Sequence, residues 1–178
     1  MKIYTKKGDK GQTDLFNSQT GSKERVSKTD PRLVVIGNLD ELNCILGIVK
    51  ALSKNSQTKL IESVQTDIFT INSILAGKPI TFSAIKVGRL ERQIDLMEKS
   101  MPPIHNFIIP GGEISSAYFH LARAVARRSE RHLVKLSEFK GKESILKYVN
   151  RLSDFLFVMA RYQNYQAKTK DLLWKRTK

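Results

Sequence analysis

The sequence has a single cysteine, Cys44, which excludes an internal disulfide and any cysteine-rich zinc site. It also lacks any apolar run close to the roughly 18 to 20 residues that a membrane-spanning helix requires. The amino-terminal stretch MKIYTKKGDKG is too polar for a secretory signal peptide. We therefore expect a cytoplasmic protein that does not enter a membrane.

Acidic residues are scarce as well, because 17 Asp and Glu stand against 31 Lys and Arg and leave a formal net charge of +14. Such a charge indicates an anionic partner, which is nucleic acid, an acidic membrane surface or a phosphorylated small molecule. Charge alone does not choose among these classes. Hydrophobic residues at 40% and charged residues at 27% are typical of a globular protein. A chain of 178 residues suits one domain.

The chain changes character near residue 33. Before it, KIYTKKGDKGQTDLF predicts two short extended pieces around a glycine loop, and NSQTGSK predicts an exposed turn. After it, apolar residues recur at helical spacing. We expect an all-α protein, in which a flexible N-terminal arm, residues 1–32, precedes a five-helix bundle, residues 33–178, within a single domain overall. The predicted helices cover residues 33–52, 59–77, 84–101, 115–136 and 143–167.

The fourth predicted helix carries the stretch ARAVARRSER. At about 100° per residue, Arg123, Arg127 and Glu130 fall within a narrow arc, with Arg131 at its edge. This arc is either a solvated face held by spaced Arg–Glu pairs or an anion site, since the planar guanidinium binds phosphate or carboxylate through two parallel hydrogen bonds. The residues expected to face the core are Leu121, Ala122, Val125 and Leu133.

The last predicted helix is apolar almost all the way round, yet Asn150, Asp154 and Arg161 share one stripe. Buried polar groups are costly unless they are partnered. One interpretation is an internal salt bridge between Asp154 and Arg161. The other is that the stripe lines a site shared with the arginine helix.

Two shorter motifs also carry charge. In TKKGDKGQT, the glycines let the backbone turn and expose amide groups, as in a loop that cradles phosphates. The order of residues is not that of a Walker A loop, and a simple exposed turn is the alternative. In GNLDELN, Asp40 and Glu41 open an apolar helix, where the helix dipole favours carboxylates in any case.

Seven stretches follow one another along the chain: YTKKGDKGQT, RVSK, GNLDELN, RLERQID, FIIPGG, RAVARRSER and NRLSDFLFVMAR. Together, from Tyr4 to Arg161, they resemble the ATP:cob(I)alamin adenosyltransferases of the propanediol-utilisation type. The resemblance implies a bundle that assembles as a homotrimer with active sites between neighbouring subunits. It implies that the 5′-deoxyadenosyl group of ATP moves to the cobalt of reduced cob(I)alamin, which forms adenosylcobalamin and releases triphosphate.

The resemblance also implies a role for each matching residue. The amino-terminal ATP loop corresponds to Thr5, Lys6, Lys7, Gly8, Thr13 and Asp14. Further ATP contacts correspond to Lys28, Arg127, Arg128, Ser129, Glu130, Arg131 and Asn150. Asp40 and Arg123 match a pair that joins adjacent subunits beside the nucleotide, and Phe107 matches the aromatic residue that covers the lower face of the cobalamin. The residues expected to act in catalysis are Asp40, Phe107, Arg123 and Arg127. One departure is NSQTGSKE before Arg25, which is longer than the family's usual glycine link.

The implied reaction needs no nucleophile from the protein, because Co(I) attacks the ribose 5′ carbon directly. Catalysis then consists of positioning and electrostatics, with Arg127, Lys28 and the loop amides stabilising charge on the triphosphate. Mg²⁺ is expected on the phosphates with few protein ligands. The three histidines show no metal-ligand spacing, so no metal site is predicted. Candidate protein partners are a corrinoid reductase and an adenosylcobalamin-dependent enzyme.

Two other functions compete with this one. The net charge and the carboxy-terminal KTKDLLWKRTK favour a basic helical nucleic-acid-binding protein. Against it, aromatic residues make up 8% of the chain and lie largely within apolar segments, and no zinc module or RNA-recognition signature is present. The other competitor is a catalytically silent relative that acts as a cobalamin carrier or ATP sensor. We expect an enzyme without a nucleic-acid partner.

Overall fold

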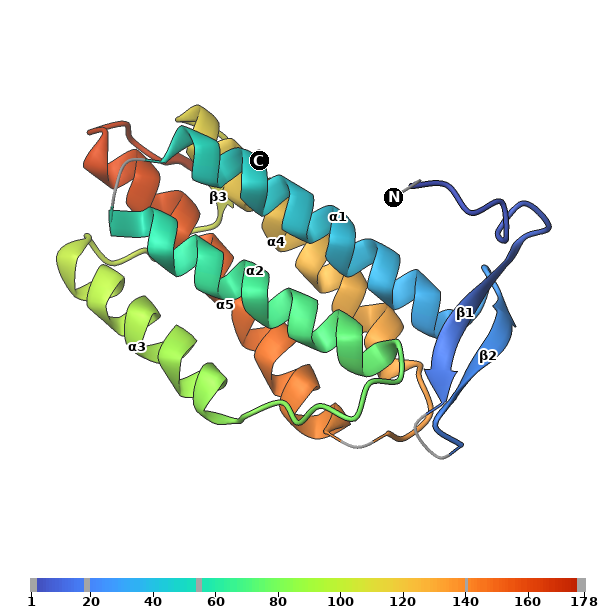
Figure 1. Ribbon diagram of the computed structural model, residues 1–178. Helices are drawn as coiled ribbons and strands as arrows, with labels where there is room; N and C mark the ends of the chain where they lie inside the picture. The colour runs from blue at the N-terminus through green and yellow to red at the C-terminus, as the bar shows by residue number, and fades with distance from the viewer. Residues whose placement is uncertain (1–2, 18–19, 54–55, 140, 176–178) are drawn as a thin grey trace.

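The computed structural model describes residues 3–17, 20–53, 56–139 and 141–175. Within these residues the chain forms five α-helices, which lie roughly alongside one another (Figure 1). Their number and approximate bounds confirm the prediction from apolar periodicity. None of the described helices combines the length and the apolar character needed to cross a membrane. The helices are α1 Pro31–Leu52, α2 Ser56–Leu75, α3 Ile85–Ser100, α4 Ile114–Val134 and α5 Lys142–Gln166.

Local chemistry accounts for where α1 begins. Asp30 is the N-cap, and its side chain accepts the backbone N–H of Arg32 at 2.8 Å. Pro31 fits the first turn, where its missing N–H has no helical partner to lose. The guanidinium of Arg32 returns to the same carboxylate at 2.8 Å and lowers the pKa of Asp30. The cap is therefore both a hydrogen bond and an ion pair.

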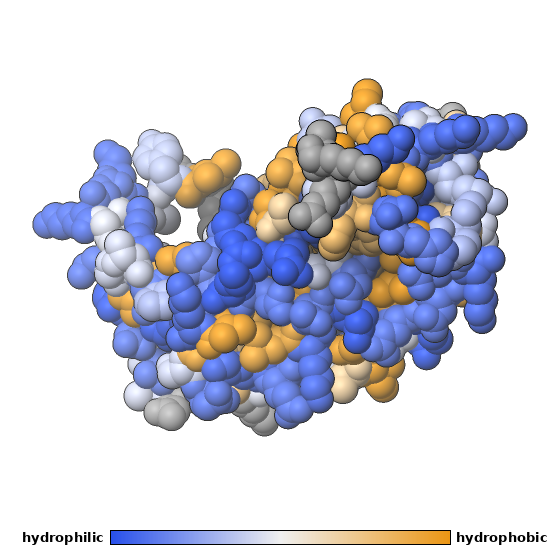
Figure 2. Space-filling view, turned by 180° about the vertical axis from the view of Figure 1, so that it is seen from behind, coloured by the Kyte–Doolittle hydropathy of each residue, from blue (hydrophilic) through white to orange (hydrophobic). Residues whose placement is uncertain are grey.

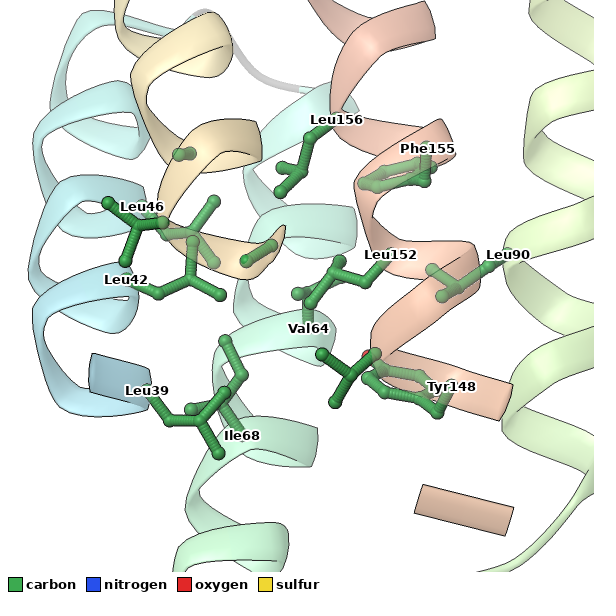
Figure 3. Packing of buried hydrophobic residues seen from close by; sticks show 14 of the residues in the cluster. Leu39, Leu42, Leu46, Val64, Ile68, Leu90, Tyr148, Leu152, Phe155 and Leu156 are labelled. Carbon is green, nitrogen blue, oxygen red and sulfur yellow. The ribbon is translucent and has the colours of Figure 1, made fainter. Parts of the chain in front are cut away.

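The core runs between α1, α2, α4 and α5. Figure 3 shows leucines of α1 directed toward Val64 and Ile68 of α2 and toward α5. Helix α5 packs against both α4 and α3, and its buried residues run from Ile145 to Asn164. Each fully buried aliphatic side chain stabilises the fold by about 1.5–3 kcal/mol. The continuous apolar surface predicted for this helix is therefore explained by neighbours on more than one side.

A β-hairpin closes one end of the bundle (Figure 1). Strands β1 Gln12–Asn17 and β2 Ser22–Ser27 pair antiparallel, a feature that the all-α prediction omitted. The backbone N–H of Phe16 donates to the carbonyl of Ala76 at 2.9 Å, just beyond α2. Gly77 has φ +94°, and a Cβ there would lie 1.6 Å from the carbonyl oxygen of Phe16. The hairpin is thus seated on the end of α2 at a contact that requires glycine. Part of the predicted turn, residues 18–19, lies outside the described residues.

A second strand pair joins two distant parts of the chain. β3 Ile108–Ile109 follows α3, and β4 Leu172–Leu173 follows α5. They pair antiparallel, and the N–H of Trp174 donates to the carbonyl of Phe107 at 2.8 Å. The described part of the basic carboxy-terminal stretch therefore lies along the FIIPGG segment.

Helix α3 lies outermost in the bundle and packs mainly on α5 (Figure 1). Asp67 of α2 is 1% exposed and forms ion pairs with Lys86 and Arg89 of α3. Tyr148 of α5 donates its hydroxyl to the same carboxylate at 2.8 Å. Burial, followed by the charge of Asp67, raises the pKa of Tyr148. A buried carboxylate thus links three helices.

Candidate functional site

The glycine-lysine loop before β1 is folded back against Lys28, at the end of β2. The N–H of Lys28 donates to the carbonyl of Gly11 at 2.9 Å, and the N–H of Gly11 donates to the carbonyl of Gly8 at 3.2 Å. A Cβ on Gly8 would lie only 3.2 Å from Nζ of Lys28. The structure therefore brings together Lys28 and the loop that the sequence placed in one site.

Arg25 of β2 is a residue that sequence reasoning missed. Its Nη2 donates to the carbonyl of Lys7 at 2.7 Å, and its Nη1 pairs with Asp14 at 3.1 Å. Asp14 lies directly opposite Arg25 in the hairpin register, next to Thr13 and Val26. The pairing holds the loop to the hairpin. Predicting the hairpin register would have revealed it, since opposite charges face each other across the strands.

The arginine segment of α4 divides into two groups. Arg127 and Arg131 are exposed on the same face, and neither has an ion pair within the described part of the chain. Arg128 instead binds Asn38 at 3.2 Å and forms an ion pair with Glu41, both on α1. These bonds hold α4 against α1. Within residues 127–131, Arg127 and Arg131 are therefore the arginines whose guanidinium groups bind no described residue.

The remaining two residues of the segment also differ. Ser129 is buried, and its hydroxyl donates to the carbonyl of Val125 at 2.9 Å. Glu130 accepts a hydrogen bond from Nδ2 of Asn150 at 2.8 Å, which joins α4 to α5. We call residues 127–131 of α4 the arginine row. It presents cations together with one carboxylate, Glu130, while Ser129 faces the core.

The structure decides between the two interpretations of the stripe on α5. Asp154 is exposed and pairs with Arg151 at 2.8 Å, one turn earlier. Arg161 is buried and pairs with Asp171 at 3.2 Å, beyond the end of the helix. The structure therefore excludes an internal Asp154–Arg161 salt bridge, in agreement with the separation of about 10.5 Å that seven residues span along a helix axis. Of the stripe, Asn150 is the residue that reaches the arginine helix.

Asp40 and Arg123 do not meet within the chain. Asp40 is exposed on α1. Arg123 is half-buried on α4, and its Nε has no hydrogen-bond partner among the described residues. Burial, followed by the charge of Arg127, lowers the pKa of Arg123. Leaving a guanidinium nitrogen unpartnered at such a position is energetically costly.

Hydrophobic side chains accompany these charges on the exposed faces of α1 and α4. Leu121 was expected in the core, but it is 49% exposed, whereas Ala122, Val125 and Leu133 are buried as predicted. Leu121 lies on the outward arc of α4, away from its packing partners α1 and α5. Figure 2 shows hydrophobic patches between hydrophilic side chains on the rear of the molecule. The exposed hydrophobic residues of these two helices include Val34, Ile48, Leu52, Ile114 and Leu121.

A cavity of about 880 Å³ lies beside the FIIPGG segment. The Phe107 side chain is 81% exposed at its edge, so this ring is not a core residue. Further walls come from Arg123 of α4, Phe157 of α5 and Trp174 beyond β4. The cavity therefore has aromatic and aliphatic walls, with the cations Arg123 and Lys175 in its lining.

His120 lines the same cavity, one turn before Arg123. Its ring packs edge-on to Phe157, with centroids 6.0 Å apart, and neither ring nitrogen has a partner among the described residues. Burial, followed by the charge of Arg123, lowers the pKa of His120, against a smaller opposing effect of Asp171. The wall is therefore electrically neutral at His120 near pH 7.

A second cavity of about 810 Å³ lies where the hairpin meets the ends of α2 and α4. Two of its charged residues, Asp30 and Arg32, already bind each other and cap α1. It contains none of the aromatic side chains around Phe107 and none of the arginine row. We therefore place the candidate site along α4, where His120, Arg123, Arg127 and Arg131 follow one another turn by turn.

Several known proteins are similar to this chain over almost its whole length. The family model for cobalamin adenosyltransferase matches residues 3–163. Corrinoid adenosyltransferase PduO of Citrobacter freundii is 38% identical over 98% of this chain, which spans only 53% of that protein. The chain thus has about half the length of this relative, whereas it covers 95% of the 34% identical corrinoid adenosyltransferase of Mycobacterium leprae.

A solved structure has the same fold. A variant of the PduO-type ATP:corrinoid adenosyltransferase from Lactobacillus reuteri, complexed with cobalamin and ATP, superposes with a TM-score of 0.90. The two are 34% identical, and the alignment covers 99% of this chain and 98% of that one. Fold, sequence motifs and family model all point the same way, and the chain belongs to the cobalamin adenosyltransferase family.

Proposed function

We propose that this protein transfers the 5′-deoxyadenosyl group of ATP to the cobalt of reduced cob(I)alamin, and that it releases triphosphate. Family membership supports the reaction class, and the relative from Lactobacillus reuteri was solved with both cobalamin and ATP. The observation that carries the proposal is the row along α4. Arg127 and Arg131 provide charge for a polyphosphate, and Arg123 continues the row into an aromatic cavity with room for the face of a corrin ring.

The nucleotide site consists of the amino-terminal loop, Lys28 and the free arginines of α4. The loop projects from the end of the bundle, beyond the hairpin (Figure 1). A loop with this reach is suited to complete the site of a neighbouring subunit. Thr5, Lys6, Lys7 and Gly8 belong to this loop, while Thr13 and Asp14 lie on β1 and Asn150 acts through Glu130.

The active assembly is a homotrimer in which α1 and α4 form the contact between subunits. Two features support this part of the proposal. Arg123 lacks a partner for Nε within the described chain, and Asp40 is exposed on the neighbouring helix. Val34, Ile48 and Leu121 leave apolar surface on the same two helices. A contact there would bury the hydrophobic side chains and pair Asp40 with Arg123 of an adjacent subunit, next to the nucleotide.

In the reaction, Co(I) donates an electron pair to the ribose 5′ carbon, the bond from that carbon to the triphosphate oxygen breaks, and triphosphate leaves with its charge. Arg127 and Lys28 stabilise this charge through hydrogen bonds that contribute about 1.5–3 kcal/mol each. Phe107 covers the lower face of the corrin and excludes a lower axial ligand, which makes Co(II) easier to reduce. Neutral His120 adds no competing charge to this apolar wall.

Mg²⁺ fits the proposed site as a companion of the phosphates. Among the described residues, no three His, Cys, Asp or Glu side chains are grouped so as to hold a metal ion. Mg²⁺ in nucleotide sites takes most ligands from phosphate and water and one or two from carboxylates. Glu130 is the carboxylate of the arginine row, and only its Oε1 is engaged by Asn150. Bound Mg²⁺ would neutralise part of the phosphate charge.

A spectroscopic assay tests the proposal. Chemically reduced cobalamin, ATP and Mg²⁺ should give the absorption spectrum of adenosylcobalamin together with one equivalent of triphosphate. Pyrophosphate plus phosphate at the first turnover would contradict direct displacement. Saturable ATP binding without turnover would indicate a silent carrier or sensor. Binding to nucleic acid that is steep in salt and indifferent to ATP would support the nucleic-acid alternative instead.

A further inference from the structure

The chain reverses direction after α5 and returns to the segment that carries Phe107. Lys168 adopts φ +57°, in the left-handed region, at this reversal. Strand β4 then pairs with β3, and the N–H of Trp174 donates to the carbonyl of Phe107 at 2.8 Å. The backbone of Phe107 is thereby fixed by the carboxy-terminal segment, although its ring is exposed. The contacts that hold β4 in place therefore also determine the position of the Phe107 ring.

Asp171, immediately before β4, is the point at which this segment is attached to the bundle. Its Oδ1 accepts from Nδ2 of Asn164 at 2.9 Å, and its Oδ2 accepts from Nε of Arg161 at 3.2 Å. Both donors come from the last turns of α5 and are 2% and 8% exposed, respectively. Nη2 of Arg161 also donates to the carbonyl of Pro102 at 2.9 Å. Two buried donors on α5 therefore converge on one carboxylate.

Asn164 binds the other end of the Phe107 segment as well. Its Oδ1 accepts from the N–H of Glu113 at 2.9 Å, and its Nδ2 donates to the carbonyl of Gly111 at 3.1 Å. A second hydrogen bond joins the two segments nearby: the hydroxyl of Thr169 donates to the carboxylate of Glu113 at 2.5 Å. The carboxy-terminal segment and the Phe107 segment are thus held by the same side chains.

We infer that Asp171 is a positioning residue for the corrin face: by anchoring β4 to Arg161 and Asn164, it fixes the backbone of Phe107 and places Trp174 at the cavity wall. The inference rests on the proposed function for its effect on cobalamin, while the anchoring itself does not depend on that function. Asp171 is not among the residues that line the cavity. It acts through Phe107 and Trp174, which line the same cavity.

The chain offers a direct probe of the anchoring, because Trp174 is its only tryptophan. In the ligand-free protein, Asp171→Asn replaces one acceptor with a donor that faces Arg161 or Asn164, so β4 should detach. Trp174 is 52% exposed in the wild type, so we expect acrylamide to quench its fluorescence up to about twofold more strongly in this variant, with the helical circular dichroism unchanged. Asp95→Asn makes the same chemical change on the exposed face of α3 and should leave the quenching as in wild type.

Kinetics then separate positioning from stability. Asp171→Asn should raise KM for cob(I)alamin about tenfold, which corresponds to ~1.4 kcal/mol, while KM for ATP stays unchanged. Should Asp171→Asn fail to fold, Thr169→Val removes the adjacent tie alone and should change quenching and corrinoid KM in the same direction. Unchanged quenching overturns the inference, and so does increased quenching with an unchanged corrinoid KM. A wild-type protein that transfers no adenosyl group would refute the proposed function, whereas the quenching result would still decide the anchoring.

Discussion

Asn150 of α5 donates a hydrogen bond from Nδ2 to Oε1 of Glu130 on α4, at 2.8 Å. The bond crosses between two helices that the sequence predicted to share a site. It engages the carboxylate nearest to Arg127 in the row, while Arg127 has no ion pair within the described chain. The guanidinium of Arg127 is therefore left available for an external anion.

Arg127→Ala should reduce kcat for adenosyl transfer by about a hundredfold or more, the usual effect of removing a group that stabilises developing charge. Because the side chain is exposed, the variant should still fold and assemble. Arg92→Ala removes an exposed arginine of α3 and serves as the control, with near-normal turnover expected. Anaerobic turnover with reduced cobalamin provides the measurement. Normal kcat in Arg127→Ala would remove this residue from the mechanism.

Asp40→Asn and Arg123→Gln should be coupled if the two side chains pair between subunits. Each single change should lower activity and reduce the free energy of trimer assembly by about 1.5–3 kcal/mol, as expected for a hydrogen bond to a charged group. The loss of assembly free energy in the double variant should be much smaller than the sum of the two single losses, because the second change removes a group that has already lost its partner. Sedimentation and activity assays over a concentration series measure the cycle. Strict additivity would rule out the pairing.

Phe107→Ala should leave ATP affinity unchanged and slow cobalt adenosylation severely, since the ring would no longer exclude a lower ligand. The ring is exposed, so its loss should cost little in the free energy of unfolding. Phe69→Ala on α2, another exposed phenylalanine, is the matched control. Titration with ATP and the spectrum of bound Co(II) separate the two effects. An equal loss of ATP binding and turnover would point to misfolding.

His120 should make the protein less stable in mild acid. Its pKa is lowered in the fold, whereas the unfolded chain takes up the proton near pH ~6.5. Below that value the unfolded state binds more protons, so the free energy of unfolding should fall with falling pH, by at most ~1.4 kcal/mol per pH unit until the folded-state pKa is reached. Denaturant unfolding of wild type and His120→Gln between pH 7.5 and ~5 should show a shallower slope in the variant.

Gly77→Ala should displace the hairpin from the end of α2. The added Cβ would meet the carbonyl oxygen of Phe16, and φ +94° is unfavourable for alanine. We expect a loss of about 2–4 kcal/mol in the free energy of unfolding and weaker ATP binding, because the hairpin carries the nucleotide loop. Gly88→Ala on α3, where a Cβ meets nothing within 4 Å, should instead be neutral or stabilising. Thermal unfolding and ATP titration distinguish the two.

The helices could be predicted because their signals are local. Apolar spacing placed all five, and it correctly buried Ala122, Val125 and Leu133. The same reasoning failed at Leu121, since a helical wheel shows that a face is apolar without showing which neighbour covers it. Periodicity alone would likewise have misplaced Phe107, whose ring is exposed. A phenylalanine before Ile-Ile-Pro is usually a core residue, and the family resemblance, rather than periodicity, pointed to the cavity.

Contacts between distant segments left no readable pattern. The pairing of β3 with β4 involves two residues on each side, and a dipeptide carries no periodicity. In the sequence, Asp171 is one charged residue within a basic carboxy-terminal stretch, and nothing there indicates its ion pair with Arg161. Arg25 was likewise hidden, because its partner Asp14 is fixed by a hairpin register that the sequence did not specify. The sequence therefore indicated the helices and the charged groups within each segment, but it did not indicate which distant segments lie in contact.

The outermost position of α3 makes this helix a suitable site for attaching a label or tag. It packs on α5 and is tied to Asp67, on the far side from α1 and α4. A fluorophore, affinity tag or surface attachment on its outward residues would stand clear of the arginine row, the aromatic cavity and the faces proposed to join subunits. The protein can thus be tethered or labelled there without blocking the proposed site.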